Sequence, residues 1–120
     1  MKKVCSFVFG AALALALLVP ASAAEPKIIK GEVIDLECSL SNGDAGKGEA
    51  HAACALGCAR DGDQMAILTD EAVYLIEGDY AANKNAKLLD FVARKVQAKG
   101  TVSEKDGKMT INVAAMAVAK

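Results

Sequence analysis

The fold is decided by residues 95–113, which read KVQAKGTVSEKDGKMTINV. The first half alternates strictly between small or apolar residues and polar ones, which is the period of a β-strand with one buried face. The Asp106–Gly107 pair is a signal for a tight β-hairpin turn, and the alternation resumes after it. The pattern therefore predicts an antiparallel hairpin. Its expected core face carries Val96, Ala98, Gly100, Val102, Met109, Ile111 and Val113.

Upstream of this hairpin the chain alternates between strand signals and helix signals. Short runs rich in Ile, Val and Leu predict strands, whereas a run rich in Ala and free of Pro favours a helix. Apolar residues at helical spacing after a pair of Asn residues predict a second helix. The expected elements are strands at 27–36, 64–68 and 72–76, a turn-rich loop at 41–48, and helices at 49–59 and 83–94.

The predicted order is strand, helical insertion, two strands, helix, two strands, which is the order of a five-stranded OB-fold barrel. The closing hairpin at 95–113 resembles that of small bacterial periplasmic OB-fold proteins, and the likeness in element order covers residues 27–118. We therefore expect a mainly β domain with short helices. Its architecture would be a five-stranded OB-like barrel with a helical insertion after the first strand and a helix between the third and fourth strands. The resemblance implies architecture and compartment, and it leaves the function open.

Residues 1–23 have the features of a cleaved secretory signal peptide. Lys2 and Lys3 give a charged start, an apolar run follows at 7–19, and Ala21-Ser22-Ala23 supplies a small-residue cleavage site. The apolar run is shorter than the roughly 20 residues that cross a bilayer. We expect residues 24–120 to form one OB-like domain that is periplasmic or secreted and has no membrane attachment after cleavage.

Composition limits the partners of this mature chain. The whole sequence has 14 Lys and Arg against 15 Asp and Glu, so the loss of Lys2 and Lys3 leaves 12 against 15, a net charge of −3. There is no Trp, and the mature aromatic residues are Tyr74, Tyr80 and Phe91. Nucleic-acid binding normally requires basic patches and aromatic stacking platforms. We therefore expect no nucleic-acid partner.

The candidate site consists of Cys38, His51, Cys54 and Cys58, which include every thiol and imidazole of the mature chain. On a regular helix over 49–59, the last three share one stripe about 60° wide. The loop before that helix would bring Cys38 back from the end of the first strand. Thiolate and imidazole are ligands of Zn²⁺ and thiolate is a ligand of Cu(I). The sequence thus predicts a non-enzymatic binding module that holds a Zn or Cu ion through a Cys₃His cluster.

Two other interpretations use the same residues. Three cysteines is an odd number, so at least one thiol lies outside any intrachain disulfide. Cys38 paired with Cys54 or Cys58 would give a disulfide-stapled domain that binds a protein or glycan partner without metal. A Cys–His pair can also activate a thiolate, but no residue at a recognisable spacing orients His51, so no enzyme is expected. Most of the carboxylates near the thiols are expected to be solvated surface charges; the set is Asp35, Glu37, Asp44, Glu49, Asp61 and Asp63.

Overall fold

The computed structural model describes residues 25–120, which form a mainly β domain with short helices. The predicted signal peptide at 1–23 lies outside the described residues, so its cleavage stays a prediction. The described chain contains five strands: β1 (Glu25–Asp35), β2 (Met65–Leu68), β3 (Val73–Glu77), β4 (Lys95–Lys105) and β5 (Lys108–Val118). Each of these overlaps a strand that the sequence predicts.

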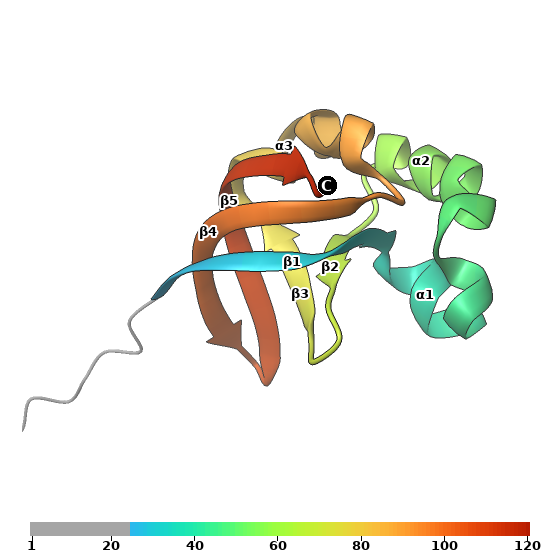
Figure 1. Cartoon of the computed structure of the whole chain (residues 1–120). Helices are drawn as coiled ribbons and strands as arrows, with labels where there is room; N and C mark the ends of the chain where they lie inside the picture. The colour runs from blue at the N-terminus through green and yellow to red at the C-terminus, as the bar shows by residue number, and fades with distance from the viewer. Residues whose placement is uncertain (1–24) are drawn as a thin grey trace, which may run out of the picture.

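The strands join one sheet in the order β1-β2-β3-β5-β4. Long β1 pairs antiparallel with both β4 and β2, and its last four residues form the β2 pairing, from Glu32 opposite Leu68 to Asp35 opposite Met65. β2 pairs antiparallel with β3, β3 pairs parallel with β5, and β5 pairs antiparallel with β4. Each strand therefore has two partners. Strand β1 runs alongside β4 and ends at the helices (Figure 1).

The predicted β4–β5 hairpin is confirmed, including its turn and its core face. Asp106 and Gly107 both have positive φ, as a two-residue turn of type I′ requires. A β-bulge lies between Lys99 and Gly100, and a Cβ at Gly100 would collide with the carbonyl oxygen of Asn112. The residues predicted to face the core are buried except Met109, which is half-buried at the hairpin end: Val96, Ala98, Gly100, Val102, Ile111 and Val113.

The helical segments depart most from the sequence prediction. The described chain has α1 (Leu36–Asn42), α2 (Ala52–Asp61) and α3 (Ala82–Asn85), with 3₁₀ turns at Gly43–Gly46, Glu49–His51, Gly78–Tyr80 and Ala86–Phe91. The chain from 36 to 46, predicted as the end of a strand and part of a loop, is therefore largely helical.

The predicted helix at 83–94 is wrong as one continuous element. Asn83, Lys84 and Asn85 all have positive φ, and they interrupt α3 before the 3₁₀ turn that follows it. Asn tolerates this left-handed conformation better than most residues do. The buried Asn85 amide also donates to the carbonyl oxygens of Ala59 and Asp63. These two long-range bonds favour the interrupted conformation.

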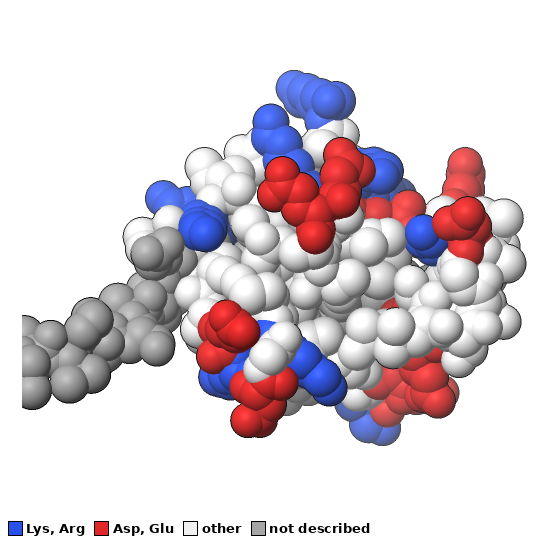
Figure 2. Space-filling view, turned by 90° about the horizontal axis from the view of Figure 1, so that it is seen from below, with Lys and Arg blue, Asp and Glu red and all other residues white. Residues whose placement is uncertain are grey.

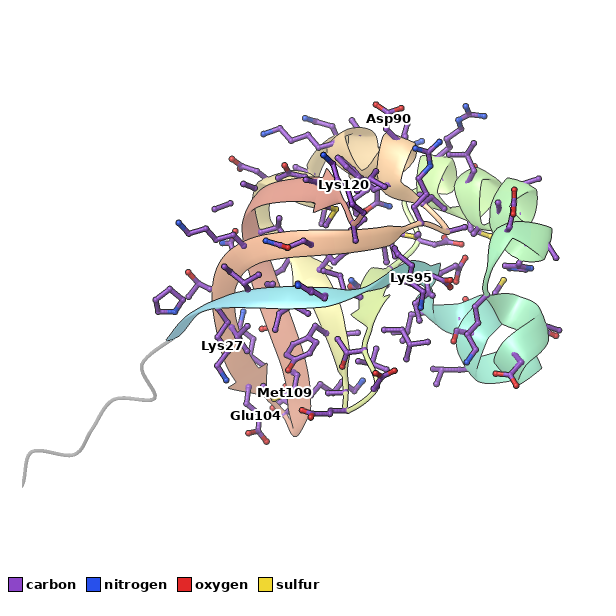
Figure 3. All side chains as sticks on the ribbon, viewed as in Figure 1. Lys27, Asp90, Lys95, Glu104, Met109 and Lys120 are labelled. Carbon is purple, nitrogen blue, oxygen red and sulfur yellow. The ribbon has the colours of Figure 1, made fainter. Side chains whose placement is uncertain are left out.

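Helices α1 and α2 lie side by side at the end of the sheet where β1 finishes (Figure 1). Ala55 and Ala59 of α2 are buried in the same core as Val33, Met65 and Leu88. Their small side chains let α2 sit close to the sheet. Figure 3 places Glu104 and Met109 at the hairpin end of the sheet and Lys95 nearer the helical end. The thiols of the candidate site all come from α1 and α2, so they lie at the helical end.

Candidate metal centre

Cys38 lies in the first turn of α1, and Asp35 determines where that helix begins. Asp35 is the last residue of β1 and has extended backbone angles, and its Oδ1 accepts a hydrogen bond from the Cys38 amide at 3.0 Å. Asp is among the best N-cap residues because its carboxylate satisfies an amide that has no partner within the helix. The sequence interpretation placed Cys38 at the end of the strand. Because Asp35 caps the helix, the strand ends three residues before Cys38, and the Cys38 thiol therefore lies on α1.

Cys54 and Cys58 lie one turn apart on α2. They are i and i+4 residues of one α-helix, so they share a face, as the sequence predicts. Gly62, in the left-handed conformation, ends the helix, and its amide donates to the carbonyl oxygens of Ala59 and Cys58. Cys54 is exposed, whereas Cys38 and Cys58 are half-buried.

The three thiols converge. The sulfur atoms of Cys38, Cys54 and Cys58 all lie within 4.8 Å of one another, and all three cysteines are free thiols. The 3₁₀ turn Gly43–Gly46 packs against α1 at Cys38. Gly46 is buried directly against Cys38, and a Cβ at Gly46 would collide with the Cys38 carbonyl oxygen. The predicted meeting of the three cysteines is therefore present in the structure.

His51 is not part of this three-thiol group. The predicted stripe assumed one regular helix from residue 49, whereas residues 49–51 form a 3₁₀ turn and α2 begins at Ala52 with His51 as its N-cap. The different rise and rotation of that turn change the direction of the His51 side chain relative to the helix. Within the described residues, the His51 Nε2 atom is buried and has no hydrogen-bond partner. A ligand role for His51 stays a prediction.

Asp35 was missed as a site residue. The sequence interpretation placed it among the solvated carboxylates, which is wrong, because its exposed fraction is 1%. Its Oδ2 atom is buried and has no hydrogen-bond partner among the described residues. Leaving such an atom unpaired costs about 1–3 kcal/mol, and more when it is charged. The sequence does indicate the capping role of Asp35, because it is a preferred N-cap residue type three positions before Cys38.

The Asp35 carboxylate also lies beside the thiols. Ligand atoms of Asp35, Cys58 and Asp63 are within 4.8 Å of one another, so Cys58 belongs both to this group and to the three-thiol group. Asp63 itself is exposed, as are Glu37, Asp44, Glu49 and Asp61, in agreement with the prediction for those residues.

Two thiol pKa values are raised, and Asp35 contributes to both. For Cys58, the Asp35 carboxylate beside the thiol is the largest cause of the raised pKa, and burial adds to it. For Cys38, burial raises the pKa most, and the Asp35 charge comes next. Both thiols therefore favour the protonated form without a metal, and a metal ion must displace their protons when it binds.

This arrangement has the donor chemistry of a site for a soft or borderline metal ion. Thiolates bind Zn²⁺ and Cu(I), and carboxylates also serve as Zn²⁺ ligands. The three thiols come from α1 and α2, which are the first and the last helix of the insertion between β1 and β2. A bound ion would therefore join α1 directly to α2.

Comparison with known protein families, with curated proteins and with solved structures found no match. Among the helices of residues 25–120, none combines the length and the apolar character needed to cross a membrane.

Proposed function

We propose that this chain is an exported, non-enzymatic binding module that holds one thiophilic metal ion through Cys38, Cys54 and Cys58. The observation that carries the proposal is the approach of the three thiol sulfurs to within 4.8 Å of one another. Three thiols in so small a volume are a donor set for Zn²⁺ or Cu(I). The periplasm, or the medium in the case of secretion, is the compartment that the signal-like residues 1–23 favour.

An OB-like barrel is the architecture that we propose for the domain carrying this site. The sheet order β1-β2-β3-β5-β4, the parallel pairing of β3 with β5 and the helical segment between β3 and β4 support it. On this view the barrel is a scaffold, and the metal-binding residues belong to the insertion after β1.

A disulfide-stapled domain is the second candidate. It is favoured by the closeness of the same sulfur atoms, since Cys38 already lies near both thiols of α2. Exported proteins commonly contain disulfides. Such a domain would use its surface for a protein or glycan partner, and Figure 2 shows uncharged surface between groups of charged side chains, most of which contain both acidic and basic residues.

Elemental analysis combined with a free-thiol count separates these two candidates. The protein is purified as its host produces it, without added chelator, and its metal content is measured before and after reduction. We expect about one Zn or Cu ion per chain and three free thiols once the ion is removed. A metal-free protein with one disulfide and one free thiol would refute the metal proposal and support the stapled domain.

Single variants test whether the metal is held by these thiols. Cys38→Ser, Cys54→Ser and Cys58→Ser should each lower the metal content, because serine is a poor ligand for soft ions. Met109→Leu is the matched control, since it removes a sulfur atom at the far end of the sheet (Figure 3). Equal metal content in the serine variants and in wild type would exclude the cluster as the site.

A further inference from the structure

The three thiols leave a tetrahedral ion one ligand short, and a second carboxylate oxygen of a buried residue is unused beside them. Asp35 is 1% exposed, and its Oδ1 is engaged by the Cys38 amide. Its Oδ2 is equally buried and has no partner among the described residues. Buried polar atoms in native proteins are nearly always paired, so this oxygen requires a specific explanation.

The position of this oxygen favours a metal ligand. An oxygen of the Asp35 carboxylate lies within 4.8 Å of the Cys58 sulfur, and Oδ1 accepts from the backbone amide of Cys38. Cys58 in turn belongs to the three-thiol group, so Asp35 adjoins that group through a shared member. His51 has no comparable link to the cluster and belongs to neither ligand group.

We propose that Oδ2 of Asp35 is the fourth ligand of the metal centre, giving a Cys₃Asp site in which Asp35 strengthens the binding of Zn²⁺ and not that of Cu(I). This inference rests on the proposed metal-binding function of the three thiols. Zn²⁺ in structural sites is almost always four-coordinate and tetrahedral, and it accepts carboxylate oxygen as well as thiolate. Cu(I) is selected by soft sulfur ligands and gains little from a hard carboxylate oxygen.

One carboxylate would then perform two tasks. Its Oδ1 fixes the first turn of α1 and with it the backbone of Cys38, and its Oδ2 binds the ion that Cys38 also binds. The approach of Oδ2 to the metal is therefore coupled to the placement of a thiol ligand. The buried oxygen gains a partner when the ion enters, which favours the loaded state.

Zn²⁺ and Cu(I) affinities of matched variants test this assignment. Each affinity is measured on reduced protein by competition with a chromophoric chelator, for wild type, Asp35→Asn, His51→Ala and Asp61→Asn. Asn keeps an oxygen that accepts from the Cys38 amide, so the N-cap survives while the charged ligand is lost. Asp61→Asn is the control, because it removes an exposed carboxylate of α2 that belongs to neither ligand group.

Asp35→Asn should weaken Zn²⁺ binding by about 100-fold or more, since even outer-shell partners of a metal site contribute about 10- to 100-fold. Its Cu(I) affinity should stay within about threefold of wild type, because the three thiols remain. His51→Ala and Asp61→Asn should keep both affinities. Unchanged Zn²⁺ binding by Asp35→Asn, or a loss in His51→Ala instead, would overturn the Asp35 assignment.

X-ray absorption by the bound Zn²⁺ gives a reading that does not depend on the folding of Asp35→Asn. Wild type and His51→Ala should both show three sulfur ligands at about 2.3 Å and one lighter ligand at about 2.0–2.2 Å. A shell of sulfur alone, or loss of the lighter ligand in His51→Ala, would overturn the assignment and leave the three-thiol function standing. A wild type that binds neither Zn²⁺ nor Cu(I) would instead refute the proposed function.

Discussion

At the scale of single residues, the three thiols differ in exposure, and this difference predicts which of them is alkylated first. Cys54 is exposed, whereas Cys38 and Cys58 are half-buried and have raised pKa values. The thiolate is the reactive form, and a raised pKa leaves less of it at about pH 8. Iodoacetamide should therefore modify Cys54 first in the metal-free, reduced protein, as measured by mass spectrometry of peptides over time.

Asp35→Asn should change that order in a defined way. It removes the largest cause of the raised pKa of Cys58, so Cys58 should become thiolate at lower pH and react faster. Cys54 should react at an unchanged rate and serve as the internal control. A Cys58 rate that is the same in both proteins would contradict the electrostatic role of Asp35.

The candidate site could be predicted from the sequence only in part. The i, i+4 spacing of Cys54 and Cys58 fixes their common face on any α-helix, so their pairing follows from the sequence. The place of His51 depends on whether the helix begins before or after it, and the 3₁₀ turn that decides this has no strong sequence signal. Burial of Asp35 follows from the packing of α1 and α2 around the end of β1, which no local pattern contains.

At the scale of elements, the 3₁₀ turn Gly43–Gly46 packs back against α1, and Gly46 is its contact point with Cys38. A Cβ at Gly46 would collide with the Cys38 carbonyl oxygen, whereas one at Gly57 on α2 would meet nothing within 4 Å. Gly46→Ala should destabilise the domain by about 1–3 kcal/mol and also lower metal content, because it displaces Cys38. Gly57→Ala should stabilise the helix by about 0.5–1 kcal/mol and leave metal content unchanged.

Urea unfolding followed by circular dichroism, with metal analysis on the same samples, measures both effects. Equal metal content in the two alanine variants would show that the turn does not position Cys38. If both variants changed the free energy of unfolding equally, the contact of Gly46 with Cys38 would not explain the effect of Gly46→Ala.

The hairpin of β4 and β5 offers a second test at this scale. Val102 is 4% exposed, and its neighbour Thr101 lies on the other face and is half-buried. Val102→Asp should cost more than about 3 kcal/mol, since it buries an unpaired charge. Thr101→Asp should cost about 1 kcal/mol or less. Thermal unfolding of the two variants compares them, and equal losses would refute the assignment of the two faces.

The strands could be predicted better than the helical segments for a physical reason. Alternation in 95–113 is a local consequence of having one buried face, and it fixes both the register and the turn. The segment at 83–94 depends instead on Asn85, whose amide binds carbonyl oxygens of Ala59 and Asp63 more than twenty positions away. Local helix propensity contains no information about such partners.

At the scale of the whole molecule, the proposed ion would tie together two helices that lie at opposite ends of the insertion between β1 and β2. That insertion holds few large apolar side chains, and α1 has no buried residue. Helix α1 is therefore held by its contacts with β1 and with the 3₁₀ turn Gly43–Gly46, whereas α2 packs against β1, α3 and the turn Ala86–Phe91. A metal that binds the folded state and not the unfolded chain must raise the stability of the whole domain.

This linkage predicts a thermal midpoint that depends on Zn²⁺. At a free concentration about 100 times Kd, the ion should add about 2.7 kcal/mol of stability. For a domain of about 96 residues, that gain corresponds to a rise of about 10–20 °C in Tm. Differential scanning calorimetry of the reduced protein, with and without Zn²⁺ and then with added chelator, measures the rise and its reversal. Cys58→Ser should show little of this rise, because one ligand is lost. Wild type and Cys58→Ser responding equally to Zn²⁺ would mean that the stabilising ion binds elsewhere on the molecule, and the coupling between the thiol cluster and folding would be refuted.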